Sequence, residues 1–452
     1  MKKIITLLFI AFFAVSCKPK AQVKSAVQIS ADTKELDSIL AHFSKADLFQ
    51  GVVLVATDDK VLLNKGYGWA DAATQKPNDP SLLYQIGSVT KQFTAAAILK
   101  LQEEGKLSVN DTISKYFPKL KEGRRITIRH MLTHTSGLFN YTNDTTFWMH
   151  EAAMPSSHEK MMSRFADKPL DFEPGTRFSY SNSGYVLLGY IIEQVSGKPY
   201  EQYIRENIFR PLGMNRSGFD FTKATNRATG YYVGGVSEPA MIVDSTGSYA
   251  AGSIYTTTSD LFKWVQAMHH KKLLKPGSWE QAFTPFKGQY GYGLIMDKMY
   301  GQKRIWHNGG IHGFVSNLEY FPESNTTVIL ISNYMHSDLA RVSRTIDAAL
   351  FGKPYELPKV RKEIKLAETT LKQYEGTYAL TNDFAITVKA EGGKLTAQAT
   401  GQGAYEIFPE KEDHFFYKVV DAQIVFEKDA TGKILALTLF QNGAEMRGKK
   451  VQ

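Results

Sequence analysis

The sequence predicts an α+β domain followed by a small all-β unit. Strand-like segments near both ends of residues 30–352 flank a mostly helical middle, which favours one antiparallel sheet built from both ends of the domain plus a helical subdomain. Beyond Gly352, the charged stretch Lys353–Lys365 contains two prolines and is followed only by short strands and turns. We therefore expect residues 353–366 to form a linker and residues 367–452 to form a small all-β barrel.

The domain begins with a helix and a hairpin. Apolar residues recur with a helical period in Asp32–Lys45. Gly51–Thr57 and Val61–Tyr67 are rich in β-forming residues and are separated by the turn-like Asp58–Lys60. The apolar run Gln92–Gln102 is typical of a buried helix.

Further helices are expected in the middle of the chain, and strands return late. Helical patterns cover Ile126–Thr133, Gly184–Val195, Asp260–His269 and Leu339–Phe351. Strand patterns cover Ile305–His307, Phe314–Phe321 and Thr327–Asn333. In the last unit they cover Gly376–Leu380, Ala385–Ala390, Leu395–Ala399, Phe415–Val420, Gln423–Glu427 and Ile434–Gln441.

The N-terminus is typical of an exported protein. Lys2 and Lys3 precede the apolar run Ile4–Val15, which is too short to span a bilayer. Cys17, the only cysteine of the sequence, follows after Ser16 and cannot form an internal disulfide. The arrangement resembles a bacterial lipoprotein signal. We expect residues 1–16 to be a signal peptide, and residues 17–29 to be a tether lipidated at Cys17 that anchors the protein to a membrane of the cell envelope or periplasm. Simple secretion is the alternative.

Composition and motifs exclude several other classes. The net charge of +9 is spread along the chain, and no nucleic-acid-binding motif is present, so we expect no nucleic-acid partner. No Gly-x-Ser-x-Gly pentapeptide supports an α/β-hydrolase. His130 and His134 are four residues apart but lack the glutamate of His-Glu-x-x-His, so we interpret both as structural and expect neither a metal nor a cofactor.

A serine and a lysine share one helix face at the start of the Gln92–Gln102 pattern. Ser88 and Lys91 are one turn apart, at a helix N-terminus that favours a developing oxyanion. A serine beside an amine is a nucleophile beside a base. The alternative is a capping serine and a solvated lysine, and Ser157–Lys160 repeats the pattern.

Two further segments carry candidate site residues. Tyr180–Asn182 lies in a loop that leads into a helix, and Tyr141–Asn143 is a second copy of the same Tyr-x-Asn pattern. His307–Gly310 lies on a late strand, where glycines permit close approach of a backbone or a substrate. A packed tyrosine and a β-bulge are the structural alternatives.

The order of these motifs resembles the serine β-lactamase and penicillin-binding-protein family. Ser-x-x-Lys at Ser88, Tyr-x-Asn at Tyr180 and His-x-Gly at His307 follow its pattern, and Ile128–Leu138 and Ala251–Thr257 are similar to its surrounding segments. The resemblance covers about residues 30–350 and is closest to class C β-lactamases with their esterase and D-aminopeptidase relatives. Residues 374–452 resemble the lipocalin-like domain often appended to such hydrolases.

The resemblance assigns roles residue by residue. It implies that Ser88 is acylated, that Lys91 is a buried lysine beside it, and that Tyr180 moves the proton. It further implies that Asn182, His307 and Gly309 bind the substrate, and that the N–H groups of Ser88 and Gly310 form the oxyanion hole. A lysine ammonium near Tyr180 favours the phenolate, although the choice of Lys91 or Tyr180 as base stays open.

His307 departs from the many family members that have lysine at this position. A histidine with its reference pKa near 6.5 is mostly neutral at pH 7. We therefore expect a weak contact with substrate carboxylates that strengthens as His307 gains a proton between pH 8 and about 6.

The resemblance implies an envelope serine hydrolase that cleaves an amide or ester of a small-molecule or peptide substrate through an acyl-enzyme. D-amino-acid peptides, peptidoglycan-related peptides and esters are the expected substrates. The alternatives are a β-lactamase or DD-carboxypeptidase proper, or a catalytically silent penicillin-binding sensor. The oligomeric state stays open.

Overall fold

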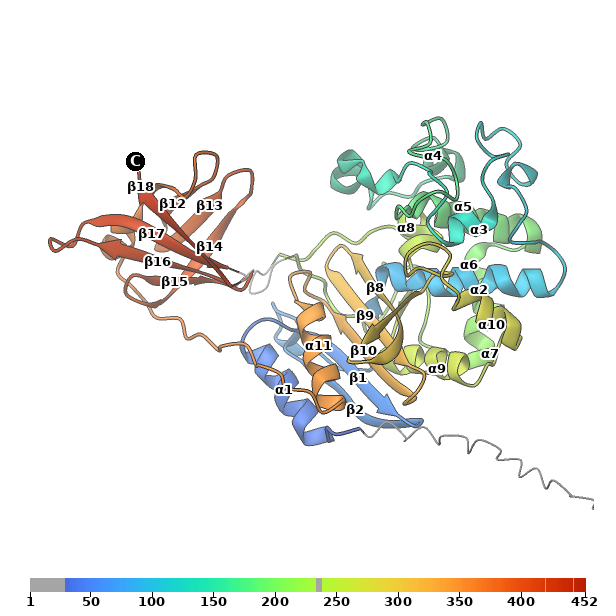
Figure 1. Ribbon diagram of the computed structural model, residues 1–452, viewed down its shortest axis with the longest axis horizontal. Helices are drawn as coiled ribbons and strands as arrows, with labels where there is room; N and C mark the ends of the chain where they lie inside the picture. The colour runs from blue at the N-terminus through green and yellow to red at the C-terminus, as the bar shows by residue number, and fades with distance from the viewer. Residues whose placement is uncertain (1–28, 233–237, 419, 442) are drawn as a thin grey trace, which may run out of the picture.

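The chain folds into an α+β domain and a β-barrel joined by an extended segment (Figure 1). The computed structural model describes residues 29–232, 238–418, 420–441 and 443–452. The predicted fold class is confirmed. The signal segment 1–16 and Cys17 lie outside the described residues.

Both ends of the α+β domain contribute strands to one antiparallel sheet with the order β2-β1-β10-β9-β8-β7. β1 pairs with its hairpin partner β2 on one edge and with the late strand β10 on the other. The first hairpin and the late strands thus belong to the same sheet. β7 was not predicted from the sequence. The strands are β1 (Gly51–Thr57), β2 (Lys60–Tyr67), β7 (Ile295–Met299), β8 (Gln302–Ile311), β9 (Phe314–Phe321) and β10 (Thr326–Ser332).

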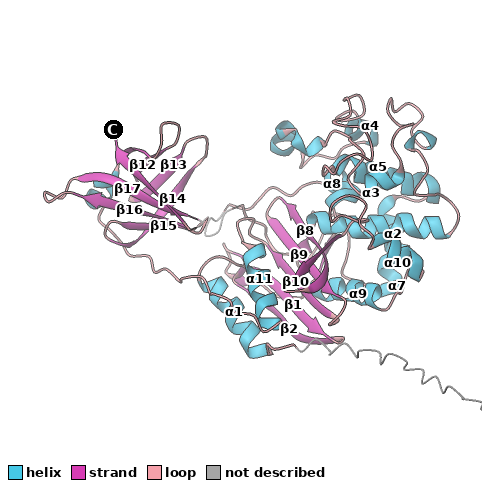
Figure 2. Ribbon diagram, in the orientation of Figure 1, coloured by secondary structure: helices cyan, strands magenta, loops and turns pink. Residues whose placement is uncertain are grey.

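The two faces of this sheet are covered by different helices (Figure 2). Val53 and Val55 of β1 pack with α1 (Thr33–Lys45) and α11 (Leu339–Leu350). Val52 and Leu54 point the other way, into the larger core. This alternation follows from the two-residue period of a strand. Because both faces are buried, β1 is apolar almost throughout.

The larger core is built around α2 (Thr90–Glu103), which is buried on nearly all sides. A helix that is apolar all round belongs inside a large domain. α2 is packed against α5 (Asn182–Ser196) and α8 (Ser245–Gly252). The other helices of this face are α3 (Ile128–Leu132), α4 (His158–Met162), α6 (Tyr200–Ile204), α7 (Arg210–Leu212), α9 (Thr258–His269) and α10 (Pro276–Ala282).

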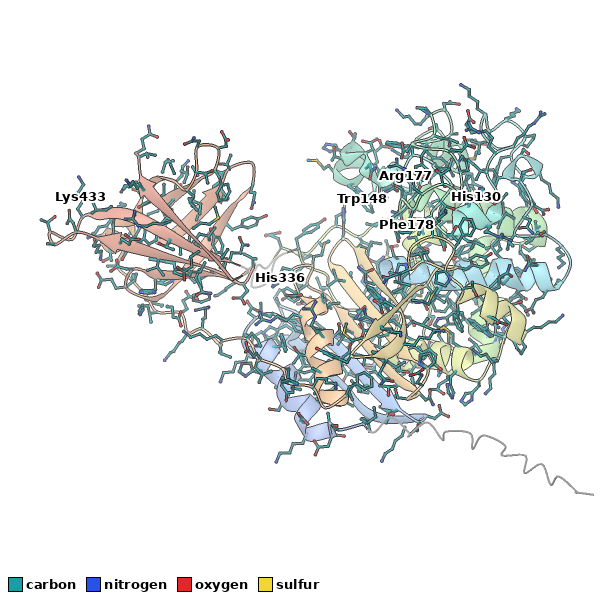
Figure 3. The ribbon with its side chains drawn as sticks, viewed as in Figure 1. His130, Trp148, Arg177, Phe178, His336 and Lys433 are labelled. Atoms are coloured by element: carbon teal, nitrogen blue, oxygen red, sulfur yellow. The ribbon has the colours of Figure 1, made fainter. Side chains whose placement is uncertain are left out.

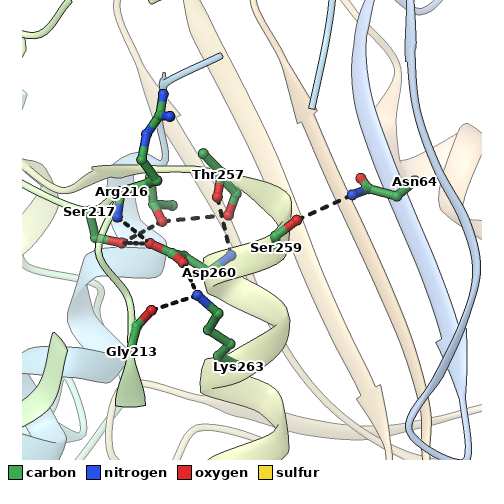
Figure 4. A network of polar contacts seen from close by, with 9 residues as sticks. Asn64, Gly213, Arg216, Ser217, Thr257, Ser259, Asp260 and Lys263 are labelled. Atoms are coloured by element: carbon green, nitrogen blue, oxygen red, sulfur yellow. Dashed lines mark hydrogen bonds and ion pairs between the residues drawn. The ribbon is translucent and has the colours of Figure 1, made fainter. Parts of the chain in front are cut away.

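A buried carboxylate fixes the start of α9 (Figure 4). Asp260 accepts hydrogen bonds from the backbone N–H of Arg216 at 2.8 Å and from Ser217 Oγ at 3.0 Å. Lys263 Nζ donates to its other oxygen at 2.8 Å. The network holds α9 beside β6 (Tyr255–Thr256), which pairs with β5 (Tyr84–Gln85). The short strands β3 (Trp69–Asp71) and β4 (Lys76–Pro77) complete this region.

The C-terminal unit is a closed eight-stranded antiparallel barrel, as the family resemblance implied. Two of its strands, β14 and β18, were not predicted. Pro409 breaks the strand pattern of β14 and lies at an irregularity of its pairing. The strands are β11 (Gly376–Ala379), β12 (Ala385–Glu391), β13 (Lys394–Ala399), β14 (Ala404–Lys411), β15 (His414–Tyr417), β16 (Ala422–Lys428), β17 (Ile434–Gln441) and β18 (Ala444–Lys450).

The extended segment between the two units contacts both of them. Tyr355 donates a hydrogen bond to Glu35 of α1 at 2.8 Å. Farther along, Arg361 pairs with Glu410 of β14 at 2.7 Å. The helix α12 (Glu368–Leu371) then leads into the barrel. The segment is therefore packed at both ends.

Candidate active site

Ser88 lies on a single 3-10 turn, η1 (Gly87–Val89), immediately before α2. Gly87 makes this turn possible in two ways. Its φ of 51° is in the left-handed region, and a Cβ at this position would be 2.8 Å from the backbone nitrogen of Gly310. Gly87 thus lets η1 approach β8 closely, which sets Ser88 beside Gly310.

The part of β8 next to Ser88 has an unpaired edge. β7 pairs with β8 only from Gln302 to Trp306, while β9 occupies the opposite edge. Within the described part of the chain no strand pairs with this edge at residues 307–311, so the backbone N–H groups that face it can serve another acceptor. Gly310 is exposed, with open space where its Cβ would be, which fits the oxyanion role that the resemblance implies.

Gly309 has a packing role that the sequence did not suggest. It is buried, and a Cβ there would collide with the carbonyl oxygen of Ile86. Ser316 Oγ on the neighbouring strand donates to the same carbonyl at 2.8 Å. This packing permits the close approach of β8 to the turn that carries Ser88, whereas the resemblance had implied a substrate contact.

Lys91 is fully buried and joins three separate parts of the chain. Its Nζ is 3.0 Å from Ser88 Oγ, 2.7 Å from Asn182 Oδ1 and 2.8 Å from the carbonyl oxygen of Ala251. These partners belong to η1, α5 and α8. Ser88, Lys91 and Asn182, which are distant in the sequence, are thus in direct contact.

Burial also controls the charge of Lys91. Loss of hydration disfavours the ammonium and holds the pKa of Lys91 well below its usual value near 10.5. None of the described groups in contact with its Nζ is a carboxylate. The surroundings therefore favour the neutral amine.

Asn182 is held through both ends of its amide. Oδ1 accepts from Lys91, and Nδ2 donates to Thr142 Oγ1 at 3.1 Å. Thr142 belongs to the second Tyr-x-Asn copy, whose Tyr141 is buried and donates to the carbonyl of Gly247 at 2.7 Å. The second copy is therefore a support for the first, a role that sequence reasoning missed.

The carbonyl of Ala251 is aimed at Lys91 by a break in α8. Tyr249 has φ 40° and ψ −132°, a strained conformation for a residue with a side chain. Its ring packs against Tyr190 and Tyr200, each with centroids 5.1 Å away. The break turns the carbonyls of Ala250 and Ala251 toward α2, where Thr94 and Lys91 donate to them.

Tyr180 lies beside Lys91. Lys91 Nζ is 4.8 Å from the centroid of its ring. Burial raises the pKa of Tyr180 above its usual value near 10, while a hydrogen bond to Ser88 acts in the opposite direction. The expectation of a phenolate is therefore wrong, because desolvation outweighs the neighbouring groups and Tyr180 stays a neutral phenol.

His134 packs against Tyr180. Its ring lies 4.1 Å from the ring of Tyr180 and 4.6 Å from that of Tyr290. Its Nδ1 accepts the N–H of Ser181 at 3.1 Å, which fixes the backbone beside Tyr180. Burial lowers the pKa of His134 well below 6.5, so it packs as a neutral ring. In the sequence, the only indication of this position was that His134 belongs to the segment Ile128–Leu138, which resembles the family.

Both ring nitrogens of His307 are used within the protein. Nδ1 donates to the carbonyl of Asn308 at 2.5 Å, and Nε2 accepts from the hydroxyl of Tyr290 at 2.8 Å. Burial is the main cause that lowers the pKa of His307 to about 3, and any positive charge on the nearby Lys91 acts in the same direction. The expectation that His307 gains a proton between pH 8 and 6 is wrong, because the reference value applies to a solvated ring.

The repeated motif at Ser157 has the structure of a helix cap. Its side chain accepts the N–H of Lys160 at 3.2 Å, at the start of α4. Lys160 is paired with Glu151 on the surface. The described residues contain no group of three or more His, Cys, Asp or Glu side chains that could hold a metal ion.

Comparisons with known proteins agree with this geometry. Residues 36–353 match the family model described as Beta-lactamase, and residues 360–450 match a domain of unknown function, DUF3471. The chain is 29% identical over 446 residues to Penicillin-binding protein 4* of Bacillus subtilis, covering 91% of this chain and 97% of that protein.

Two solved structures have the same fold. The octameric penicillin-binding protein homologue from Pyrococcus abyssi is 28% identical with a TM-score of 0.64, covering 93% of this chain and 100% of that one. A D-stereospecific amidohydrolase from Streptomyces sp. is 25% identical with a TM-score of 0.62, covering 72% and 100%. Because the family model matches more than half of the chain, the chain belongs to the beta-lactamase family of serine hydrolases, as its motifs predicted.

Proposed function

We propose that this protein cleaves an amide or ester through an acyl-enzyme on Ser88. The observation that carries the proposal is the buried, carboxylate-free contact of Lys91 Nζ with Ser88 Oγ at 3.0 Å. A serine hydroxyl is a weak nucleophile until a base takes its proton. Lys91 Nζ lies within hydrogen-bond distance of this hydroxyl, which supports its role as that base.

Lys91 is the base that the geometry favours. A neutral amine has two N–H donors and one lone pair. The two donors match Asn182 Oδ1 and the carbonyl of Ala251. In this scheme the lone pair then accepts the proton of the Ser88 hydroxyl, whose oxygen lies 3.0 Å away. Ser88 Oγ then attacks the substrate carbonyl carbon while its proton passes to Lys91 Nζ. The backbone N–H groups of Ser88 and Gly310 stabilise the resulting oxyanion.

Tyr180 is the proton donor in this scheme. As a neutral phenol it gives its proton to the leaving nitrogen or oxygen when the tetrahedral intermediate breaks down, and Lys91 restores that proton. Water then attacks the acyl-Ser88 ester by the same proton path in reverse. Over the whole cycle the atoms of substrate and water equal those of the products, so the scheme needs no cofactor.

We propose that the part of the substrate that binds beside Ser88 carries no charge. Burial drives Lys91, His134 and His307 toward their uncharged forms, so these three groups offer little positive charge. The site thus offers little to a free carboxylate, which disfavours efficient β-lactamase or DD-carboxypeptidase activity. Esters and D-amino-acid or peptidoglycan-related amides fit better, and the Streptomyces relative is named a D-stereospecific amidohydrolase.

We also propose that the protein is exported and anchored in the cell envelope through a lipid on Cys17. The support is the N-terminal sequence, with Lys2 and Lys3 before an apolar run that ends next to Cys17. Among the helices of the described residues, none is long and apolar enough to cross a membrane.

We predict that Ser88→Ala abolishes covalent labelling by a fluorophosphonate or a labelled penicillin, because it removes only the nucleophile. Ser157→Ala is the matched control and should be labelled like the wild type. Labelling can be followed on a denaturing gel and by mass spectrometry. Label retained in Ser88→Ala would refute the assignment. A wild-type adduct that never turns over would favour the silent penicillin-binding sensor.

We predict that Lys91→Arg and Lys91→Met each lower the acylation rate by at least about 10²-fold, the usual size of an acid–base contribution. Arginine keeps a positive charge but cannot accept a proton near neutral pH, and methionine keeps the volume without the amine. Stopped-flow kinetics measures the rate, and circular dichroism checks folding. Near-normal acylation by Lys91→Arg would show that the charge, rather than the free amine, matters.

We predict that pH does not change substrate preference between pH 8 and 6. The measurement is the ratio of kcat/KM for a substrate with a free carboxylate to that for its neutral methyl ester. The pKa of His307, about 3, keeps the ring neutral throughout, and the pH dependence of Ser88 acylation cancels in the ratio. His307→Lys should raise the ratio at both pH values. A wild-type ratio that rises toward pH 6 would contradict the buried, neutral His307.

We predict that Cys17→Ser moves the protein from the membrane fraction to the soluble fraction when it is expressed in a bacterium. The change removes the lipidated sulfur and leaves residues 30–452 untouched. Immunoblotting of fractionated cells, with metabolic labelling by a fatty acid, measures the effect. Recovery of both forms in the soluble fraction, without label in the wild type, would leave simple secretion as the better account.

A further inference from the structure

The described residues fill one end of the barrel and leave the other end open. Tyr374, which follows α12, packs against Phe415 and Phe426 and fills the end of the barrel near Asp413, where it also donates a hydrogen bond. At the opposite end a cavity of about 500 Å³ reaches between the strands. Residues of the α+β domain line its mouth. They are Tyr232, Met335 and His336.

The cavity is lined by uncharged and mostly apolar side chains. Phe384, Ile386 and Leu439 are among the apolar ones, and the amides of Gln402 and Gln441 supply polar groups. No aspartate, glutamate, lysine or arginine is found among the described residues that line it. A volume of this size with an apolar lining and few polar groups is typical of small-molecule sites. The lining disfavours an ion and suits an uncharged ligand.

Exposed apolar side chains gather at this mouth. Tyr232, Tyr405 and Val420 are 43%, 40% and 37% exposed, and all three line the cavity. Single exposed apolar residues are ordinary, but a group of them around one cavity marks a contact surface. They come from both units, so the surface depends on the full chain.

A strip of aromatic rings connects this mouth with the catalytic centre. The ring of Trp148 lies 5.0 Å from that of His312, and His312 Nδ1 is 2.9 Å from the hydroxyl of Tyr232. Tyr232 lines the cavity. Trp148 lies on the side of the α+β domain toward the barrel, and His336 lies beside the barrel (Figure 3). We call Trp148, His312 and Tyr232 the aromatic strip.

The aromatic strip begins at the groups that surround Ser88. Trp148 Nε1 donates to the carbonyl of Thr142 at 3.0 Å, and Thr142 holds Asn182. His312 follows Gly310 by two residues, in the turn between β8 and β9. Seen from Gly310, the cavity lies beyond the side chains of His312 and Tyr232. A substrate arm that reaches the cavity must therefore be long, narrow and uncharged.

We propose that the open end of the barrel binds an aliphatic chain carried by the substrate, and that the aromatic strip leads this chain there from Ser88. The proposal rests on the function proposed above and adds no chemical step to it. It names the substrate class as neutral esters or amides with a long alkyl arm. Burial of the chain in the cavity supplies binding energy remote from the reacting bond.

Binding is tested separately from catalysis with the neutral fluorophore N-phenylnaphthylamine and the mature full-length protein. Ala399 lines the cavity, and Ala399→Trp fills it. Ala430, in the exposed loop between β16 and β17, gives the matched control Ala430→Trp. Saturable fluorescence in the wild type and the control, lost in Ala399→Trp, is the expected result. Equal binding by all three proteins would overturn the proposal.

Catalysis is tested with two ester pairs, p-nitrophenyl acetate against decanoate, and methyl acetate against decyl acetate. The long chain is on the acyl side of the ester in the first pair and on the alcohol side in the second. In at least one of the two pairs, wild type and Ala430→Trp should have a kcat/KM at least about tenfold higher for the long-chain ester, since about two buried methylene groups account for that factor. Ala399→Trp should lose the preference. If that variant does not fold, Tyr232→Ala, which changes an exposed residue of the strip, should also lose it.

The outcomes separate this proposal from the proposed function. Hydrolysis of the short esters without a preference for either long chain would overturn the aliphatic site alone. A preference that survives both Ala399→Trp and Tyr232→Ala would also overturn it. Absence of hydrolysis and of Ser88 labelling would refute the proposed function, while fluorophore binding would still decide whether the cavity binds an apolar ligand.

Discussion

The burial of one amine constrains the whole α+β domain. An unpaired buried polar group costs about 1–3 kcal/mol, and a buried unpaired charge costs more. Lys91 avoids this only because Ser88, Asn182 and Ala251 reach it from η1, α5 and α8. These three contacts depend on the packing of α2 on all sides, on the strained backbone of Tyr249 and on the hydrogen bond from Asn182 to Thr142.

The same burial makes the centre electrically neutral. Desolvation lowers the pKa values of Lys91, His134 and His307 and raises that of Tyr180, so each group is driven to its uncharged form. In such surroundings a proton moves between neutral groups rather than between fixed charges. In the mechanism proposed above, charge appears only as the reaction proceeds, at the position where the backbone N–H groups of Ser88 and Gly310 are proposed to stabilise it.

The sequence was sufficient for the fold class, and the one-turn spacing of Ser88 and Lys91 predicted that these two side chains meet. Asn182 is far from them in the chain, and only the family resemblance implied that it belongs to the same site. The sequence could not supply the protonation states. The pKa of His307 depends on burial by segments remote in the chain, and a reference value ignores this. It also missed β14, where Pro409 interrupts the strand pattern, and the support that the Tyr141 copy gives to Asn182.

The connection between the two units gives the barrel its orientation. The extended segment is held by Tyr355 on α1 and by Arg361 on β14, and Arg341 of α11 pairs with Asp421 at 2.7 Å. These contacts turn the open end of the barrel toward the α+β domain, while Tyr374 fills the other end. Surface ion pairs alone are worth little, so the orientation relies on several contacts acting together. A barrel that served only as a spacer would not need an unfilled end at this position.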